Sequence, residues 1–303
     1  MISPERLSRR VIKRRSVPRE LECALPDDLH PVLRRVFASR QVSSSELDLS
    51  LAAMIPVGRL AGASESAELL AAARQQQDHV MVLGDFDADG ATATALMMTC
   101  LRKFGFTYVS YLVPDRFRYG YGLSPEIAEL AAQQRPSVII TVDNGISSHE
   151  GVERCYQLGI KVIVTDHHLP GLELPSAQII VNPNLPDSEF PSKNLCGVGV
   201  AFYVAAALGR LLADQGVIST AYARQVCVDC LDLVALGTVA DLVLLDRNNR
   251  VLVAEGLRRI RAGRVRPGIS ALFDCAGRQT EDATTADLGY AIAPRLNAAG
   301  RLT

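Results

Sequence analysis

Short runs of apolar, β-branched residues alternate with helical patterns from residue 79 onward. The strand-like runs contain few polar residues and lie at 79–86, 108–113, 137–143, 161–166 and 177–182. Between the first four runs, the spacing of apolar residues predicts helices over 91–104, 124–134 and 148–158. Strands that are apolar on both faces are typical of a parallel sheet with helices on each side. The pattern therefore predicts an α/β fold with a doubly wound, mostly parallel sheet.

The segments on either side of this region carry no strand signals. Residues 1–75 are expected to form helices and loops, and the chain becomes helical again from about residue 198 to its end. We therefore expect a helical N-terminal segment at 1–75, an α/β domain at 76–246 and a helical segment at 247–303. The sequence stops at 301–303 with no residues that would mark the end of a domain. We therefore expect that it is a portion of a longer protein and that a second domain would follow.

Composition narrows the class of protein. Hydrophobic residues make up 48% of the 303 residues and charged residues 21%, which allows a large buried core and excludes a disordered chain. Apolar stretches such as 198–208 are too short and too interrupted to span a bilayer, so we expect no membrane partner. Seven cysteines without framework spacing suit a reducing compartment, and we expect a cytoplasmic protein.

Basic residues gather in two places, although the net charge is only −1. Residues 1–20 carry six arginines and Lys13 against two glutamates. The second cluster consists of Arg258, Arg259, Arg261, Arg264 and Arg266. Such patches are typical of contact with a polyanion, and equally of solvated helix faces.

The most informative stretch is GDFDADG at 84–90, where three carboxylates stand at alternate positions after a predicted buried strand. Asp85, Asp87 and Asp89 would repel one another unless a cation lay among them. Hard divalent cations with oxygen ligands meet this requirement. An EF-hand loop is excluded, because its twelfth position would be Leu96 and because a strand precedes the motif.

Further candidate ligands follow two more strands and one apolar helix. They are Asp143 in VDNG, Asp166, His167 and His168 in TDHH, and Asp241 in GTVAD. Parallel strands end at one edge of a sheet, so these residues should converge with the first motif. Taken singly, each has an ordinary structural explanation, such as a helix cap or a packed histidine. Together they predict a site for Mn²⁺ or Mg²⁺, with enough ligands for two ions.

Two other features have less weight. Cys227 and Cys230 form a single C-x-x-C in an apolar helical run, which favours buried thiols over a zinc or redox site. The sequence contains neither a glycine-rich dinucleotide fingerprint nor a P-loop, so it does not support a dinucleotide cofactor or a Walker-type nucleotide hydrolase.

The motifs D-x-D-x-D, V-D-N-G, D-H-H and G-T-V-A-D resemble those of the DHH phosphoesterase superfamily. Similar segments run through the whole chain, among them 82–96, 141–153, 164–171, 233–246 and 294–302. Within the superfamily the chain resembles the single-strand-specific 5′→3′ exonucleases, and 76–246 would be the DHH domain. Leu83 stands where the manganese pyrophosphatases carry a histidine ligand, which argues against that branch.

The resemblance implies roles for individual residues. Asp87 and Asp143, with Asp85, would bind the first ion, and Asp89, Asp143, His167 and Asp241 would bind the second. Two residues would be catalytic: His168, which would stabilise charge on the scissile phosphate, and Asp166, which would orient a histidine. Phosphate contacts are expected from Arg116, Arg295 and Arg301, for which surface or helix-capping roles stay open.

The resemblance also implies an activity, namely metal-dependent hydrolysis of single-stranded DNA from the 5′ end with release of 5′-mononucleotides, in recombination and DNA repair. We expect a monomer with single-stranded DNA and repair proteins as partners. Two alternatives stay open: an oligoribonuclease or nucleotide phosphatase of the same superfamily, and an inactive binding fragment. Because such proteins continue into further domains, we expect reduced activity from the isolated chain.

Overall fold

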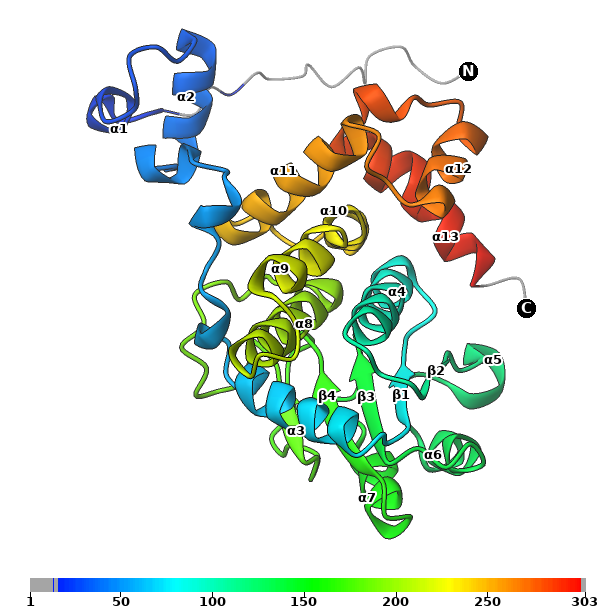
Figure 1. Ribbon diagram of the computed structural model, residues 1–303. Helices are drawn as coiled ribbons and strands as arrows, with labels where there is room; N and C mark the ends of the chain where they lie inside the picture. The colour runs from blue at the N-terminus through cyan, green and yellow to red at the C-terminus, as the bar shows by residue number, and fades with distance from the viewer. Residues whose placement is uncertain (1–12, 14–15, 301–303) are drawn as a thin grey trace, which may run out of the picture. The chain divides into compact units, whose positions relative to one another are not determined.

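The computed structural model describes residue 13 and residues 16–300, without the side chain of Arg116 (Figure 1). By its internal contacts the chain divides into two units, Met1–Leu49 and Ser50–Thr303. The smaller unit contains α1 (Arg19–Cys23), α2 (Pro31–Ser39) and η1 (Ser44–Leu47), and its described residues form no strand. The predicted divisions at 75/76 and 246/247 stay predictions.

A five-stranded sheet lies in the larger unit. Its strands are β1 (Val80–Leu83), β2 (Val109–Leu112), β3 (Val138–Val142), β4 (Lys161–Thr165) and β5 (Ile179–Val181). Their order is β2-β1-β3-β4-β5, and every neighbouring pair is parallel. All five predicted strands are present, each shorter than its apolar run, and β1 and β5 are half as long as the runs at 79–86 and 177–182. The prediction of a parallel, doubly wound sheet is confirmed.

Helices make up most of the rest of the larger unit. They are α3 (Ala63–Gln75), α4 (Ala88–Lys103), α5 (Arg116–Tyr119), α6 (Pro125–Ala132), α7 (His149–Gln157), α8 (Gly197–Asp214), α9 (Thr220–Val228), α10 (Leu231–Ala240), α11 (Arg247–Arg261), α12 (Pro267–Cys275) and α13 (Ala293–Ala299). Short turns η2 (Leu51–Ala53), η3 (Val57–Arg59) and η4 (Thr280–Asp282) and the π-helical η5 (Asp287–Ile292) connect them. The helices predicted within the α/β region correspond to α4, α6 and α7.

Both faces of the sheet are covered, which explains why its strands are apolar throughout. Val80 and Val82 of β1 belong to a large core that includes residues of α3, α4 and α8. Met81 and Leu83 of the same strand belong to a second core with α6 and α7. Because successive side chains of a strand point to opposite faces, this alternation places β1 between two helical layers.

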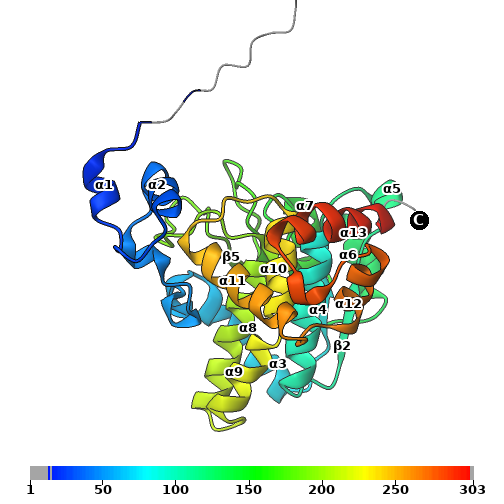
Figure 2. The same ribbon diagram turned by 90° about the horizontal axis from the view of Figure 1, so that it is seen from above.

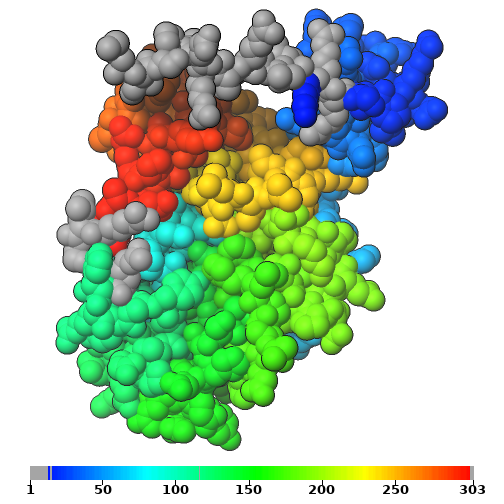
Figure 3. Space-filling model, turned by 180° about the vertical axis from the view of Figure 1, so that it is seen from behind, coloured from blue at the N-terminus to red at the C-terminus, as the bar shows by residue number. Residues whose placement is uncertain are grey.

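The C-terminal helices lie against the start of the sheet domain. Helix α10 packs against α4, α8 and α11, and α13 packs against both α4 and α10 (Figure 2). From behind, the red residues of the C-terminal segment adjoin the cyan residues around α4 (Figure 3). Segments separated by some two hundred residues of sequence are thereby brought to one side of the sheet.

Helix α8 is the one described helix that is long and apolar enough to cross a membrane by length and composition. Of its apolar window, 72% is buried inside the fold. The helix packs against α3 and α4, which is the environment of a core helix in a globular domain.

Candidate metal centre

The loops that carry the predicted ligands leave the sheet at one edge. Leu83, the last residue of β1, is in register with Thr141 of β3, and Val142 is in register with Thr165 of β4. The three motifs begin within two residues of these strand ends. They therefore lie side by side, as the parallel arrangement predicts.

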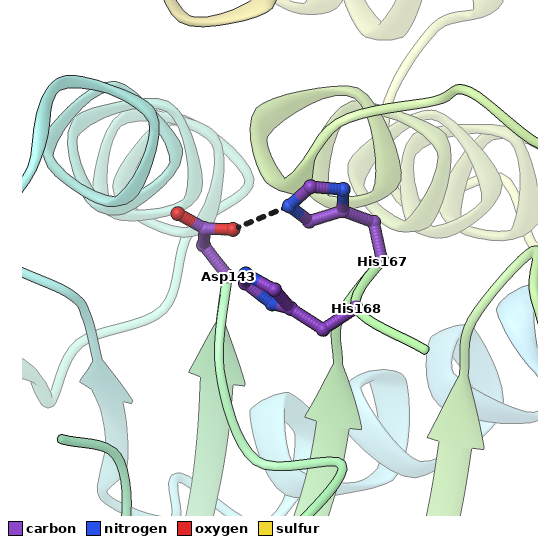
Figure 4. Close-up of side chains that lie close together, drawn as sticks. All are labelled: Asp143, His167 and His168. Atoms are coloured by element: carbon purple, nitrogen blue, oxygen red, sulfur yellow. Dashed lines mark ion pairs between the residues drawn. The ribbon is translucent and has the colours of Figure 1, made fainter. Parts of the chain in front are cut away.

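His167 lies at the centre of the resulting cluster, and Figure 4 shows its ring facing the carboxylate of Asp143. Its Nε2 atom is 3.1 Å from Oδ1 of Asp143, 3.6 Å from Oδ2 of Asp241 and 4.0 Å from Oδ2 of Asp89. The Nε2 atom and Oδ1 of Asp143 are both buried, and neither has a hydrogen-bond partner among the described residues. Buried polar atoms are nearly always satisfied, so this pair fits coordination of a cation.

The possible ligand atoms form compact groups, each within 4.8 Å. One group consists of Asp85, Asp87 and Asp143, and another consists of Asp89, His167 and Asp241. Asp143 also groups with His167 and His168. The fold thus brings together all six residues predicted to bind metal, and their carboxylate and imidazole donors suit Mn²⁺ or Mg²⁺.

Burial makes this cluster of acids electrostatically unfavourable. Burial raises the pKa of Asp143, and the carboxylate of Asp87 raises it further. The pKa of Asp89 is likewise raised by burial and then by Asp143. Burial also raises the pKa of Asp241 at the end of α10. A divalent cation would remove this cost, because it stabilises the charged form of each carboxylate.

The backbone of Asp143 adopts a left-handed conformation with φ of 64°. This conformation is uncommon for a residue other than glycine and needs support from its surroundings. The hydroxyl of Tyr121 donates a hydrogen bond of 2.7 Å to the carbonyl oxygen of Asp143. Next to it, the buried amide of Asn144 donates to the carbonyl oxygens of Leu83 and Val142 at 3.2 and 2.9 Å. These bonds tie the end of β1 to the end of β3.

The N-terminus of α8 holds Asp89. The backbone N–H groups of Gly197 and Val198 donate to its two carboxylate oxygens at 2.7 and 2.9 Å. A helix N-terminus favours such a negative charge. Position 197 requires glycine, because a Cβ there would lie 2.4 Å from Oδ1 of Asp143. Sequence prediction missed this contact, although a glycine inside an apolar helical run signals a close approach.

His168 and Asp166 form a pair beside the ligands. Nδ1 of His168 is 2.7 Å from Oδ1 of Asp166, and this oxygen also accepts from the backbone N–H groups of His167 and His168. The hydrogen bond to Asp166 raises the pKa of His168, while burial opposes the shift. The side chain of His168 remains 48% exposed. Asp166 is thus placed to orient His168, with the imidazole open to a substrate.

The predicted phosphate-binding arginines are described only in part. Arg116 begins α5, but its side chain lies outside the described residues, as does the whole of Arg301. Arg295 lies on α13, where its Nη1 atom donates to the carbonyl oxygen of Ala291 at 2.6 Å. Contacts of these arginines with a phosphate stay predictions.

The basic cluster at 258–266 is largely engaged within the fold. Four of its five arginines have internal partners, which are Glu255, Asp229, Ala283 and Asp232. This result favours the structural interpretation of the cluster over a polyanion surface. The N-terminal basic patch falls mostly on residues outside those described.

The C-x-x-C pair is buried, as predicted. Cys227 and Cys230 are 7% and 0% exposed, and the Sγ atom of Cys230 lies 3.8 Å from that of Cys100. Among the described residues, no candidate metal-ligand group includes these cysteines. Packing of thiols in the core accounts for their positions.

The sequence matches known proteins over most of its length. The single-stranded-DNA-specific exonuclease RecJ of Escherichia coli strain K12 is 52% identical over 296 residues, which cover 96% of this chain and 50% of the relative. The protein of the same name in Haemophilus influenzae is 48% identical over 295 residues, which cover 97% and 50%. The chain therefore spans about half the length of these curated relatives.

Solved structures agree with this similarity. A crystal structure of exonuclease RecJ bound to manganese matches with a TM-score of 0.70 and 35% identity, over 82% of this chain and 59% of that chain. RecJ from Thermus thermophilus in complex with Mn²⁺ matches with a TM-score of 0.73 and 32% identity, over 94% and 39%. The sequence pattern of the DHH family, N-terminal domain, matches residues 79–238, which hold the sheet and most of the clustered ligands. The chain belongs to the DHH family.

Proposed function

We propose that the protein hydrolyses single-stranded DNA from the 5′ end in a metal-dependent reaction that releases 5′-mononucleotides, in recombination and repair. The observation that carries this proposal is the buried, unsatisfied pair formed by Asp143 Oδ1 and His167 Nε2 among further acidic ligands. The relatives support it, because they are single-stranded-DNA-specific exonucleases and RecJ structures have been solved with bound manganese or Mg²⁺.

Two ions, Mn²⁺ or Mg²⁺, would be held by the two groups of ligands. One would lie among Asp85, Asp87 and Asp143, and the other among Asp89, His167 and Asp241. Asp143 would be shared, since its Oδ1 atom is 3.1 Å from Nε2 of His167 in the second group. When bound, such ions supply Lewis acidity and neutralise negative charge at phosphorus.

The residues of the chain would orient the substrate and stabilise charge. Asp166 accepts from Nδ1 of His168 and raises the pKa of its imidazole, which favours the doubly protonated form. The Nε2–H group of that imidazolium would donate to a phosphate oxygen. Arg116, Arg295 and Arg301 would bind neighbouring phosphates through the planar guanidinium group. Exposed aromatic side chains are available for stacking against bases, since Phe117 and Tyr121 are 69% and 54% exposed.

The same proposal extends to the domains of the protein, its oligomeric state, its location and its partners. Residues 76–246 would form the catalytic domain, with helical segments at 1–75 and 247–303 beside it. The protein would act as a monomer in the cytoplasm, with single-stranded DNA as substrate, repair proteins as partners and no membrane contact.

Digestion of labelled DNA tests this function. The 303-residue chain is incubated with 5′-labelled single-stranded and duplex DNA and with Mn²⁺ or Mg²⁺, with the E. coli relative as positive control. We expect labelled mononucleotides from the single strand alone and none in the presence of a chelator. If the relative digests the DNA and this chain cleaves only short oligoribonucleotides or nucleotide phosphates, the proposal is wrong and the small-substrate alternative replaces it.

A further inference from the structure

The segment at the end of α13 contacts the loop that carries Asp87 at two points. Oδ1 of Asn297 accepts a hydrogen bond of 2.8 Å from the backbone N–H of Ala88. Gly300 lies so close to Phe86 that a Cβ at position 300 would be 2.5 Å from the carbonyl oxygen of Phe86. Phe86 and Ala88 flank Asp87 in the sequence, so both neighbours of one predicted metal ligand lie against the end of α13, at Gly300 and Asn297.

Asn297 supplies a hydrogen bond that α4 cannot supply itself. Ala88 is the first residue of α4, so its N–H has no acceptor within the helix. The side chain of Asp87 caps this helix, but it accepts from the N–H of Gly90. Ala88 is 1% exposed, and without Asn297 its N–H would be buried with no partner. The contact therefore stabilises the start of α4 and the loop before it.

Helix α13 is itself held by the elements around the site. It packs against α4 and α10, and Asp241 is the residue that follows α10. Leu296 packs against the large core, which anchors the face of α13 next to Asn297. The preceding π-helix η5 also packs against α10. The position of Asn297 is thus coupled to the helices that bear the ligands.

In the other ligand group, Asp89 has a support of its own. Asp89 is fixed by the N–H groups of Gly197 and Val198 at the start of α8. Neither of these bonds involves α13. A change in α13 should therefore move the carboxylate of Asp87 more than that of Asp89.

We propose that Asn297 and Gly300 are positioning residues. They place the loop at 86–88 so that the carboxylate of Asp87 can bind one of two cations, namely the one that Asp85, Asp87 and Asp143 would hold. This inference rests on the proposed function, because it requires cation binding by that group. The proposal makes the C-terminal segment part of the metal site, although none of its described residues belongs to a candidate ligand group.

Titration of the metal-free 303-residue chain with Mn²⁺, followed by electron paramagnetic resonance of the free ion, tests this proposal. Asn297→Leu keeps the side-chain size and removes the acceptor. It should raise the Kd of one of the two bound ions about tenfold and leave the Kd of the other unchanged. Asn297→Asp keeps an acceptor oxygen and should restore at least the wild-type affinity. Gly300→Ala should weaken binding of the same ion, because the added Cβ would lie 2.5 Å from the carbonyl oxygen of Phe86. The backbone at 300 has φ of −67° and accepts alanine without strain, so the effect would come from this contact alone.

A matched control removes a similar cap far from the ligands. The hydroxyl of Ser219 accepts from the N–H of Tyr222 at the start of α9, at 3.1 Å. Ser219→Ala should leave the affinities of both ions unchanged. Because Asn297→Leu and Gly300→Ala perturb the loop in different ways, failure of one to fold leaves the other as the test.

The outcomes separate this inference from the function it rests on. Wild-type affinities in Asn297→Leu or in a folded Gly300→Ala would overturn the positioning role. Equal weakening of both ions, with a matching loss of thermal stability, would reveal general destabilisation and would overturn it too. A wild-type chain that binds no Mn²⁺ would refute the proposed function itself, and the inference with it, before any variant is compared.

Discussion

The substitution Gly197→Ala probes how closely α8 approaches the acidic cluster. The added Cβ would lie 2.4 Å from Oδ1 and 2.5 Å from Cβ of Asp143. Both distances are shorter than real contacts of a Cβ atom, so either Asp143 or the start of α8 must move by roughly half an ångström or more. Asp143 cannot yield easily, because its left-handed backbone is held by the hydroxyl of Tyr121.

The expected magnitude follows from overpacking. Forcing an extra methyl group into a filled site costs about 1–3 kcal/mol, which corresponds to about 5- to 150-fold in an equilibrium constant. Retreat of α8 would also withdraw the two N–H groups that hold Asp89. We therefore expect weaker binding of both ions. The rate of DNA hydrolysis should fall about 100-fold, because displacing a catalytic group by about 1 Å has an effect of this size.

The assay is a Mn²⁺ titration and a single-strand digestion, each with the variant beside the wild type. Gly268→Ala is the matched control, since Gly268 lies in the first turn of α12 and an added Cβ would meet nothing within 4 Å. The control should bind Mn²⁺ and digest DNA as the wild type does. Unchanged affinity and rate in Gly197→Ala would refute the argument from close packing.

Three further predictions concern the same site and its surroundings. Asp143→Ala should abolish binding of both ions and lower the rate of DNA hydrolysis by several orders of magnitude, because both ligand groups depend on it; a near-normal rate in the digestion assay would contradict the two-ion arrangement. Cys227→Ala should leave that rate unchanged, because the thiol is buried in core packing, whereas a large loss would revive a zinc or redox role. Because burial raises the pKa of Asp89 and Asp143, the folded metal-free chain binds their protons more tightly than the unfolded chain. Its thermal midpoint should therefore fall as the pH rises above about 4, where the unfolded carboxyls ionise, and saturating Mn²⁺ should remove this fall. A midpoint that does not change with pH in the presence of a chelator would contradict the assigned pKa directions.

Much of the fold could be predicted because its signals are local. A strand buried on both faces must be apolar throughout, and the five runs from 79 to 182 meet this condition. The convergence of Asp85, Asp143 and His167 was also predictable, since parallel strands end at one edge of a sheet. Strand ends were less predictable, since the predicted first run extends to residue 86 whereas β1 ends at Leu83, before the motif that turns toward the site.

Other features depend on contacts that no local pattern encodes. The cluster at 258–266 is basic in sequence, yet Arg259 and Arg266 are engaged by Asp229 and Asp232 from neighbouring helices. Sequence prediction treated the C-terminal arginines as phosphate ligands and assigned no role to Asn297. The bond from Ala88 to Asn297 joins residues 209 positions apart, and only the packing of α13 on α4 brings them together.

By itself, the sequence determined which residues are available for chemistry and which edge of the sheet they share, because strand burial, helix periodicity and the spacing of carboxylates are properties of short segments. The tertiary structure alone decided how those residues are held. The amide groups of α8 on Asp89, the left-handed backbone of Asp143 and the contact of α13 beside Asp87 all arise where elements distant in sequence pack within a few ångströms. Close packing fixes such contacts, because each depends on the shape of every neighbour at once.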